Sequence, residues 1–225
     1  MFLLRPPGVY RPQGDTFLLS ESLSRLDLRP GARILDICSG TGLMSVLAAR
    51  HTVAAQVTAV DVSLRAAFAA WFNTTVRGLR VRVLRGDLFE PLRGEEFDVI
   101  LANPPYVAGR SRPPGSHSAA RAWDAGLDGR RLLDRICAAA PRHLAAGGTL
   151  LIVHSALCGV EASLRHLREA GLRATVDARR PERFGPVMRA RAAQLAAQGL
   201  IEPGQCEEEL VVIRARRHAA AAQAA

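Results

Sequence analysis

The sequence predicts an α/β protein whose mostly parallel sheet is covered by helices on both faces. Short apolar runs typical of fully buried parallel strands, such as residues 97–101, alternate along the chain with segments of helical period. This alternation is typical of βαβ units, which place consecutive strands parallel in one sheet. A turn of small residues, Gly40-Thr41-Gly42, follows the first apolar run. In such folds this turn lets the backbone approach a ligand closely.

Each expected element has its own signal. At the N-terminus, residues 1–30 form a loop and a helix, because the apolar positions of 17–26 share one helical stripe, with Asp15 or Thr16 as the N-cap. Strands are expected at 33–37, 56–61, 80–84, 97–101, 149–154, 172–178 and 210–213. Further helices are expected at 43–49, 63–76, 130–144, 161–170 and 186–199. Residues 109–129 are rich in Pro and Gly and are expected to form a loop or lid.

We expect one domain over residues 1–217 and a disordered Ala-rich tail at 218–225, since no repeat or linker interrupts the alternation. The formal net charge is +9, and every basic residue is Arg. These arginines are spread along the chain, so the charge alone leaves a nucleic-acid partner open. No apolar run has the length of a membrane helix and no signal peptide is evident, which makes the cytoplasm the expected location.

Cysteine and histidine positions argue against a metal site. The four cysteines, Cys38, Cys137, Cys158 and Cys206, are widely scattered, and none has metal-ligand spacing with another Cys or a His. We therefore expect reduced thiols that are mostly buried, with neither a metal centre nor a disulfide framework.

An acidic residue stands at the end of each of the first three expected strands. Asp36 closes the first, Asp61 the second, and Asp87 follows the third. A carboxylate next to the glycine turn would repel a pyrophosphate but suits a cation, and an acid at the second strand end binds ribose hydroxyls in such folds. Together these positions predict a nucleoside ligand with a positive group and no phosphate, which describes S-adenosylmethionine. The expected cofactor-binding residues are Asp36, Cys38, Ser39, Gly40, Thr41, Gly42, Asp61, Val62, Gly86, Asp87, Leu88 and Asn103.

The stretch Asn103-Pro104-Pro105-Tyr106 follows the fourth expected strand. Neither proline can donate to a strand ladder, and Pro104 moves Asn103 out of the α region. The result is a stiff loop at the carboxyl end of a strand, where open α/β sheets bind ligands. The loop could also serve only to end the strand.

On these residues the chain resembles the class I S-adenosylmethionine-dependent methyltransferases. It resembles most closely their HemK-like branch, which methylates the side-chain nitrogen of a glutamine in class 1 translation release factors. The stretch Val9 to Leu19 is similar to the N-terminal helix of the short members, and Trp123 to Arg130 is similar to their Gly-Gly-x-Asp-Gly segment. The resemblance extends to about residue 216 and fits a short form without the N-terminal helical domain. The chain departs from the pattern at Gly14, usually acidic in short members, and at Cys38 and Ala125, which stand at glycine positions.

The resemblance implies a Rossmann-like, doubly wound, seven-stranded sheet whose last strand is antiparallel. It also implies that Asn103, Pro104, Pro105 and Tyr106 are catalytic and that Asn103, Pro104 and Tyr106 bind the substrate. The Asn103 side-chain oxygen and the Pro104 carbonyl would accept the two amide hydrogens, and Tyr106 would pack against the planar group. The implied partners are a class 1 release factor as protein substrate and a small zinc-binding activator. No general base is expected, and His117 and His154 are expected to be surface or structural residues.

Other functions remain open at this point. A nucleic-acid methyltransferase acting on adenine N6 or guanine N2 of DNA or RNA could use the same tetrapeptide, and the basic charge would help. The sequence shows no basic stripe studded with aromatic residues for stacking bases, and Trp71 is expected in a helix core. A non-catalytic binding protein on this fold is a second alternative, which the intact strand-end acids disfavour. The tetrapeptide disfavours a small-molecule methyltransferase.

Overall fold

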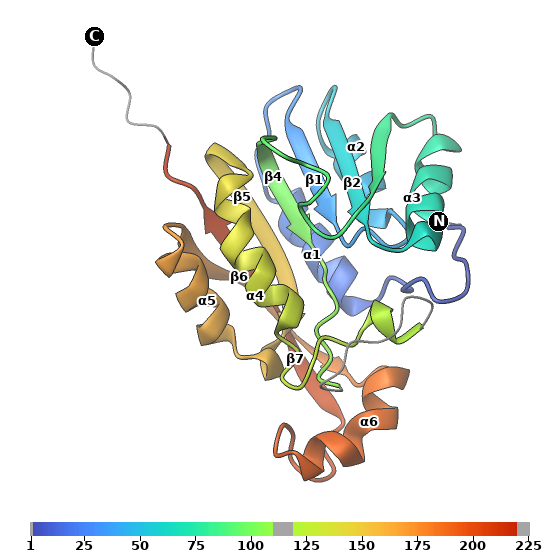
Figure 1. Ribbon diagram of the computed structural model, residues 1–225, viewed down its shortest axis with the longest axis vertical. Coiled ribbons are helices and arrows are strands. Elements are labelled where there is room, and N and C mark those ends of the chain that lie inside the picture. Colours follow the sequence, from blue (N-terminus) through green and yellow to red (C-terminus); the bar gives the residue numbers. More distant parts are fainter. Residues whose placement is uncertain (1, 110–118, 220–225) are drawn as a thin grey trace.

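The structure is a computed structural model that describes residues 2–109 and 119–219. Within these residues one seven-stranded sheet runs in the order β3-β2-β1-β4-β5-β7-β6 (Figure 1). Its first five strands in chain order pair in parallel, and β7 is antiparallel to both β5 and β6, as expected. The strands are β1 (Arg33–Ile37), β2 (Gln56–Asp61), β3 (Val81–Arg85), β4 (Phe97–Ala102), β5 (Leu144–Ser155), β6 (Arg173–Arg183) and β7 (Glu207–Arg216).

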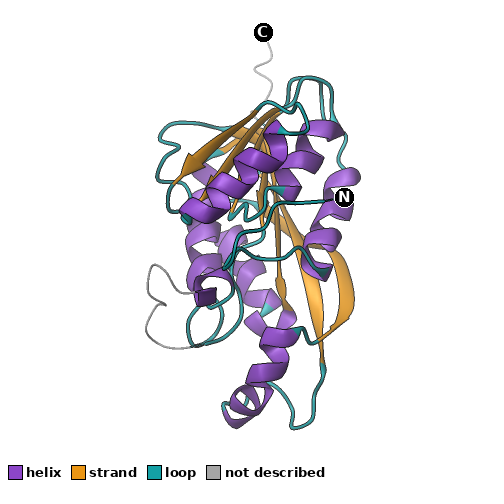
Figure 2. Cartoon of the chain, turned by 90° about the vertical axis from the view of Figure 1, so that its right-hand side faces the viewer, coloured by secondary structure: helices purple, strands orange, loops and turns teal. Residues whose placement is uncertain are grey.

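Helices cover both faces of this sheet (Figure 2). The α-helices are α1 (Gly14–Ser24), α2 (Leu43–His51), α3 (Leu64–Thr75), α4 (Arg131–Ala139), α5 (Val160–Glu169) and α6 (Pro186–Ala197). Short 3₁₀ turns lie at η1 (Ala119–Ala122), η2 (Ala140–Arg142) and η3 (Ala156–Cys158). None of the helices in the described ranges is long and apolar enough to cross a membrane.

Alternate side chains of the central strands point to opposite faces of the sheet and pack into two separate cores. On β1, Leu35 and Ile37 pack with α4 and α5 on one face, while Ile34 packs with α1 and α2 on the other. A smaller apolar cluster around Met188 holds α6, the lowest helix in Figure 1, near the ends of β6 and β7. A sheet buried on both faces explains why its central strands read as continuous apolar runs.

Element order is as predicted, but several boundaries differ. The last three strands are each longer than expected, and the helix expected over 130–144 ends at Ala139 because Pro141 follows in η2. The N-cap prediction was wrong: α1 begins at Gly14 after Gln13, and Asp15 lies inside its first turn. The carboxylate of Asp15 is used elsewhere, as described below.

The outer face of α3 is a second correction. Trp71 was expected in the core, but half of its surface is exposed. Small residues such as Ala70 take the inner face of α3, because the backbone there approaches Gly42 so closely that a Cβ on Gly42 would lie 2.8 Å from the Cα of Ala70. The bulky residues therefore point outward.

Some expectations fall partly or wholly outside the described residues. These are residues 110–118 of the expected lid, with His117, and residues 220–225 of the expected tail. All four cysteines are free; Cys137 and Cys158 are buried, Cys38 is half-buried and Cys206 is exposed. No group of three or more His, Cys, Asp or Glu residues in the described part could hold a metal ion.

Candidate active site

A cavity of about 1130 Å³ opens at the carboxyl ends of β1, β2 and β4, beside the first turn of α1. All predicted site residues line it except Gly42. Gly42 instead sits at the start of α2 with φ 75° and allows the close packing of α2 against α3. The prediction that the other residues share one site agrees with their positions, because parallel strands end at one edge of the sheet.

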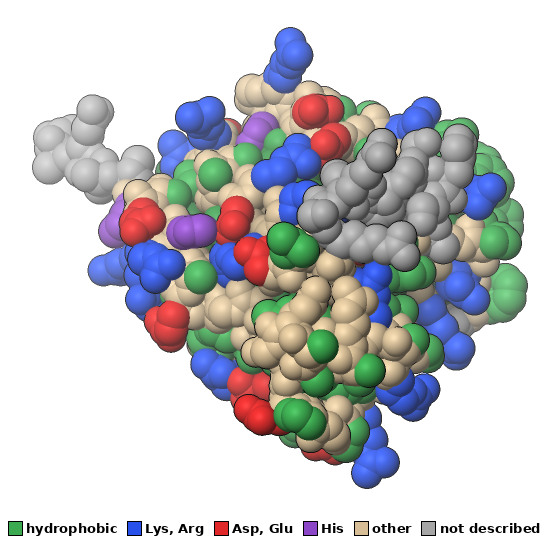
Figure 3. Space-filling model, turned by 60° about the horizontal axis from the view of Figure 1, so that its bottom comes forward, with side chains coloured by type: hydrophobic (Ala, Val, Ile, Leu, Met, Phe, Trp, Pro, Cys, Tyr) green, Lys and Arg blue, Asp and Glu red, His purple; other side chains and the backbone are tan. Residues whose placement is uncertain are grey.

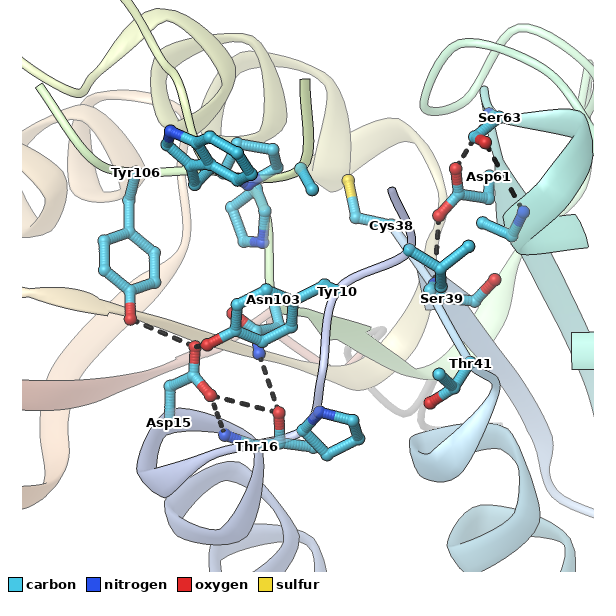
Figure 4. A pocket seen from close by; sticks show the side chains of 18 of the residues that line it. Tyr10, Asp15, Thr16, Cys38, Ser39, Thr41, Asp61, Ser63, Asn103 and Tyr106 are labelled. Carbon is cyan, nitrogen blue, oxygen red and sulfur yellow. Dashed lines mark hydrogen bonds between the residues drawn. The ribbon is translucent and has the colours of Figure 1, made fainter. Parts of the chain in front are cut away.

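The turn after β1 is tied to the end of β2 through Asp61. The backbone N–H of Gly40 donates to Asp61 Oδ2 at 2.9 Å, and that of Ser63 donates to Asp61 Oδ1 at 2.8 Å (Figure 4). The turn needs left-handed backbone at Cys38 (φ 58°) and Gly40 (φ 54°). Cys38 is tolerated there at some conformational cost, since a side chain disfavours this region.

Asp36 is almost fully buried at the end of β1. Its carboxylate accepts a hydrogen bond from Ser45 Oγ at 2.6 Å. Burial, with a smaller contribution from the nearby charge of Asp61, raises the pKa of Asp36 to about 7, although the hydrogen bonds from Ser45 oppose this rise. A positive group placed beside this carboxylate would compensate for its burial.

These donors and acceptors fit S-adenosylmethionine. Buried Asp36 suits a cation, and half-exposed Asp87, which accepts from Arg135 at 3.0 Å, lies on the same rim. Ser39 Oγ is buried in the cavity wall without a hydrogen-bond partner among the described residues, so it can serve a polar ligand. The donor set therefore agrees with the cofactor predicted from the sequence.

Asn103 follows β4 directly and faces the first turn of α1. Its Nδ2 donates to Thr16 Oγ at 3.2 Å, and Thr16 in turn donates from its hydroxyl (3.0 Å) and its backbone N–H (2.5 Å) to Asp15 Oδ1 (Figure 4). The other carboxylate oxygen, Asp15 Oδ2, accepts from the hydroxyls of Tyr10 at 2.8 Å and Tyr106 at 3.0 Å. Burial, followed by the charge of Asp15, raises the pKa of both tyrosines, so the phenols stay protonated donors.

Comparisons with known proteins agree with this geometry. The family model "Methyltransferase small domain" matches residues 11–118. A Methanocaldococcus jannaschii protein named for N5-glutamine methylation is 33% identical over 182 residues, which are 81% of this chain and 90% of that protein. The chain belongs to the class I S-adenosylmethionine-dependent methyltransferases, in the family of protein N5-glutamine methyltransferases.

Other relatives differ in their named substrates. A Bordetella pertussis release factor glutamine methyltransferase is 37% identical over 74% of this chain and 64% of its own length. A Bradyrhizobium diazoefficiens ribosomal protein uL3 glutamine methyltransferase is 42% identical over 53% of this chain and 39% of its own length. This chain therefore matches only part of each of these longer enzymes.

The fold of this methyltransferase also matches a solved structure, the E. cuniculi Mtq2–Trm112 complex, which is described as responsible for the methylation of the eRF1 translation termination factor. The TM-score is 0.64 at 21% identity, covering 93% of this chain and 99% of that chain. The prediction of a Rossmann-like methyltransferase fold with an antiparallel seventh strand is confirmed.

Sequence reasoning missed the first turn of α1 as part of the site of this methyltransferase. Tyr10, Asp15 and Thr16 lie in a stretch noted for its resemblance, with Asp15 or Thr16 expected only as a helix N-cap, and no role was predicted for Glu182. A Cβ on Gly14 would lie 2.3 Å from Glu182 Oε2, so the Glu182 carboxylate fills the space where a side chain at position 14 would lie. This wall of the cavity therefore has a carboxylate even though position 14 is a glycine.

The segment 123–130 braces the loop that carries Tyr106. Val107 donates to Trp123 O at 2.8 Å and accepts from Ala125 N at 3.0 Å, which joins the two segments as a short parallel bridge. Behind it, the Cys158 thiol donates to the Tyr106 carbonyl at 3.0 Å, and Gly129 packs so closely that a Cβ there would lie 2.3 Å from the same oxygen. Part of the expected lid is therefore a support for the loop from Asn103 to Tyr106.

His154 lies away from the cavity. It is completely buried on β5, its Nδ1 contacts Ser155 O at 2.8 Å, and burial lowers its pKa to about 4. The expectation that it has a structural role agrees with this position.

Proposed function

We propose that this methyltransferase transfers the methyl group of S-adenosylmethionine to the side-chain amide nitrogen of a glutamine in a class 1 release factor. The observation that carries the proposal is the placement of the Asn103 carboxamide. It stands at the end of β4, in the same cavity as Asp36 and Asp61. An acceptor nitrogen bound at Asn103 would therefore lie next to the cofactor.

The chemistry needs positioning more than a base. A glutamine amide nitrogen is a weak nucleophile because its lone pair is delocalised into the carbonyl. Acceptors that hold both N–H groups, the Asn103 side-chain oxygen and the Pro104 carbonyl, would aim the nitrogen at the methyl group. The two prolines keep this loop stiff, so little conformational entropy is lost on binding.

A release factor is favoured over ribosomal protein uL3 by the extent of similarity. The release factor enzyme matches 74% of this chain, whereas the uL3 enzyme matches 53%. Translation termination takes place in the cytoplasm, so the proposed substrate places the enzyme there.

Nucleic acid is a weaker candidate. Basic side chains, all of them arginine in this chain, are scattered over the face seen in Figure 3 and do not form a continuous stripe. Proteins that bind single strands without base readout usually combine such a stripe with stacking aromatics.

The exposed face of α3 supports a second part of the proposal, a small activator protein. Leu64, Phe68 and Trp71 are each at least half exposed at helical spacing, and the rings of Phe68 and Trp71 lie 5.7 Å apart. Two arginines flank these side chains: Arg65 lies on the same helix, and Arg77 follows just after its end. Such a face suits a protein whose apolar surface is rimmed by acidic residues.

A purified Trm112 protein is the probe for this surface. It should comigrate with the wild type in gel filtration but not with the double variant Phe68→Asp, Trp71→Asp. The variant Phe17→Asp, at an equally exposed phenylalanine on α1, should still bind. No complex with the wild type, or an unchanged complex with the double variant, would refute this part of the proposal.

The main test offers labelled cofactor and a choice of acceptors. Purified release factor, uL3, total tRNA and ribosomal RNA are incubated separately with the enzyme, and label is expected on the release factor. Asn103→Ala should still bind the cofactor in calorimetry and transfer no label. Label on RNA alone would overturn the proposal, and undiminished transfer by Asn103→Ala would remove Asn103 from its role.

A further inference from the structure

We propose that Thr16, held by Asp15, is a positioning residue that fixes which end of the Asn103 carboxamide faces the substrate. The inference rests on the proposed function, because it concerns an acceptor that offers N–H groups to Asn103. It assigns a role to the first turn of α1, which supplies both Asp15 and Thr16.

The direction of the hydrogen bonds follows from counting hydrogens. A carboxylate can only accept, so the single hydroxyl hydrogen of Thr16 points to Asp15 Oδ1, 3.0 Å away. Thr16 Oγ is then left to accept from Asn103, 3.2 Å away, and its partner there must be an N–H. Nδ2 therefore faces Thr16, and Oδ1 is the end of the carboxamide directed away from it (Figure 4).

This orientation matters because the two ends of a carboxamide have nearly the same shape but opposite hydrogen-bonding roles. With Oδ1 toward the cavity, Asn103 accepts from a substrate NH₂ group. With the amide turned over, two donors would face each other, and the substrate would bind weakly or in an unproductive position. Sterics alone would hardly choose between these states.

Burial protects the hydrogen-bond network of Asp15, Thr16 and Asn103 from competition by water. Asp15 and Thr16 are only 2% and 5% exposed, so solvent does not readily replace either partner. The hydroxyls of Tyr10 and Tyr106 occupy the other carboxylate oxygen and hold Asp15 in place. Since Tyr106 closes the same tetrapeptide that Asn103 opens, one carboxylate anchors both ends of the catalytic loop.

The test compares three variants at saturating cofactor. Thr16→Val keeps the shape and removes the acceptor, so we expect kcat to fall about tenfold, the effect of losing one buried hydrogen bond. Thr16→Ser restores the hydroxyl and should stay within about threefold of the wild type on the same scale. Thr74→Val is the matched control: Thr74 is also buried and bonds only to backbone carbonyls of α3, so kcat should not change.

A second readout needs no acceptor. In ¹⁵N-labelled protein, the side-chain amide signal of Asn103 is identified by its loss in Asn103→Ala. One of its two protons should exchange slowly with solvent in the wild type and in Thr16→Ser, and both should exchange quickly in Thr16→Val.

The two proposals fail in different ways. Absence of label on every acceptor with the wild-type enzyme would refute the proposed function, while the exchange measurement would still test the orientation. Equal amide exchange in the wild type and Thr16→Val would overturn the orientation. A loss of kcat that more cofactor restores would also overturn it, because Thr16 would then act on cofactor binding.

Discussion

We expect Asp36 to make cofactor binding depend on pH. Burial raises its pKa to about 7 in the protein without ligand, and we expect binding of the positively charged cofactor beside it to require the ionised form. Between pH 7 and pH 5.5 the ionised fraction falls from about one half to about one thirtieth, so the affinity should fall about fifteenfold. The α-amino group of the cofactor, with an ordinary pKa of about 7.7–8.0, stays charged over this range.

Calorimetry at the two pH values measures this directly. Titrations at pH 5.5 in two buffers of different ionisation enthalpy should also show release of nearly one proton per cofactor bound. Asp36→Asn keeps a hydrogen-bond acceptor for Ser45 but cannot titrate, so its weaker affinity should be the same at both pH values. An equal affinity of the wild type at pH 5.5 and pH 7 would refute the assignment of Asp36 to the cofactor cation.

The same carboxyl group has the opposite effect on stability. Its folded pKa of about 7 lies above its ordinary value of 3.8. Its contribution to folding is therefore complete at pH below 3.8 and is lost as pH rises to about 7. The ligand-free protein should gain roughly 1.5 kcal/mol between pH 7 and pH 5.5 relative to Asp36→Asn. His154, whose pKa is lowered to about 4, acts in the opposite direction in both proteins and cancels in the comparison.

Two further substitutions test the support of the site. Gly129→Ala should lower turnover about a hundredfold, because its Cβ would lie 2.3 Å from the Tyr106 carbonyl oxygen and displace the catalytic loop. Gly147→Ala has the same backbone strain, with φ 76° against 75°, but open space around it, so steady-state kinetics should show no loss beyond reduced stability. Asp61→Ala should weaken cofactor binding in calorimetry about tenfold or more, since two charge-assisted hydrogen bonds to the loops of the cavity are lost. Asp98→Ala is the control: its carboxylate also accepts a backbone N–H, from Arg33, but at the opposite, amino-terminal ends of β1 and β4, so its loss should leave the cofactor affinity unchanged. An equal loss of affinity in the two variants would contradict the role of Asp61.

Residues at strand ends could be predicted from the sequence, because a parallel sheet gathers the carboxyl ends of its strands at one edge. Asp36, Asp61 and Asn103 were found in this way, without any side-chain geometry. The hydrogen bonds from Tyr106 to Asp15 and from Asn103 to Thr16 could not be found, because they depend on how α1 packs against the sheet, and no local pattern records that contact. The prediction of an N-cap for Asp15 used a local rule where a tertiary contact decides.

The error at Trp71 has a similar cause. A helical stripe in a sequence shows that one face differs from the other, but in α3 the alanines, and not the aromatics, face inward. Close packing against Gly42 leaves room there only for small side chains. In α3 the bulky side chains are therefore the exposed ones. This outcome is set by the short distance between α2 and α3, which the sequence does not show.

Locating the transferred methyl group tests the central claim most directly. Release factor treated with the wild-type enzyme and isotopically labelled S-adenosylmethionine is digested and sequenced by tandem mass spectrometry. The label should lie on one glutamine side-chain amide and be absent when that glutamine is replaced by alanine. Label on a lysine, an arginine or the backbone would contradict the claim that the Asn103 loop presents a glutamine side-chain amide to the methyl donor.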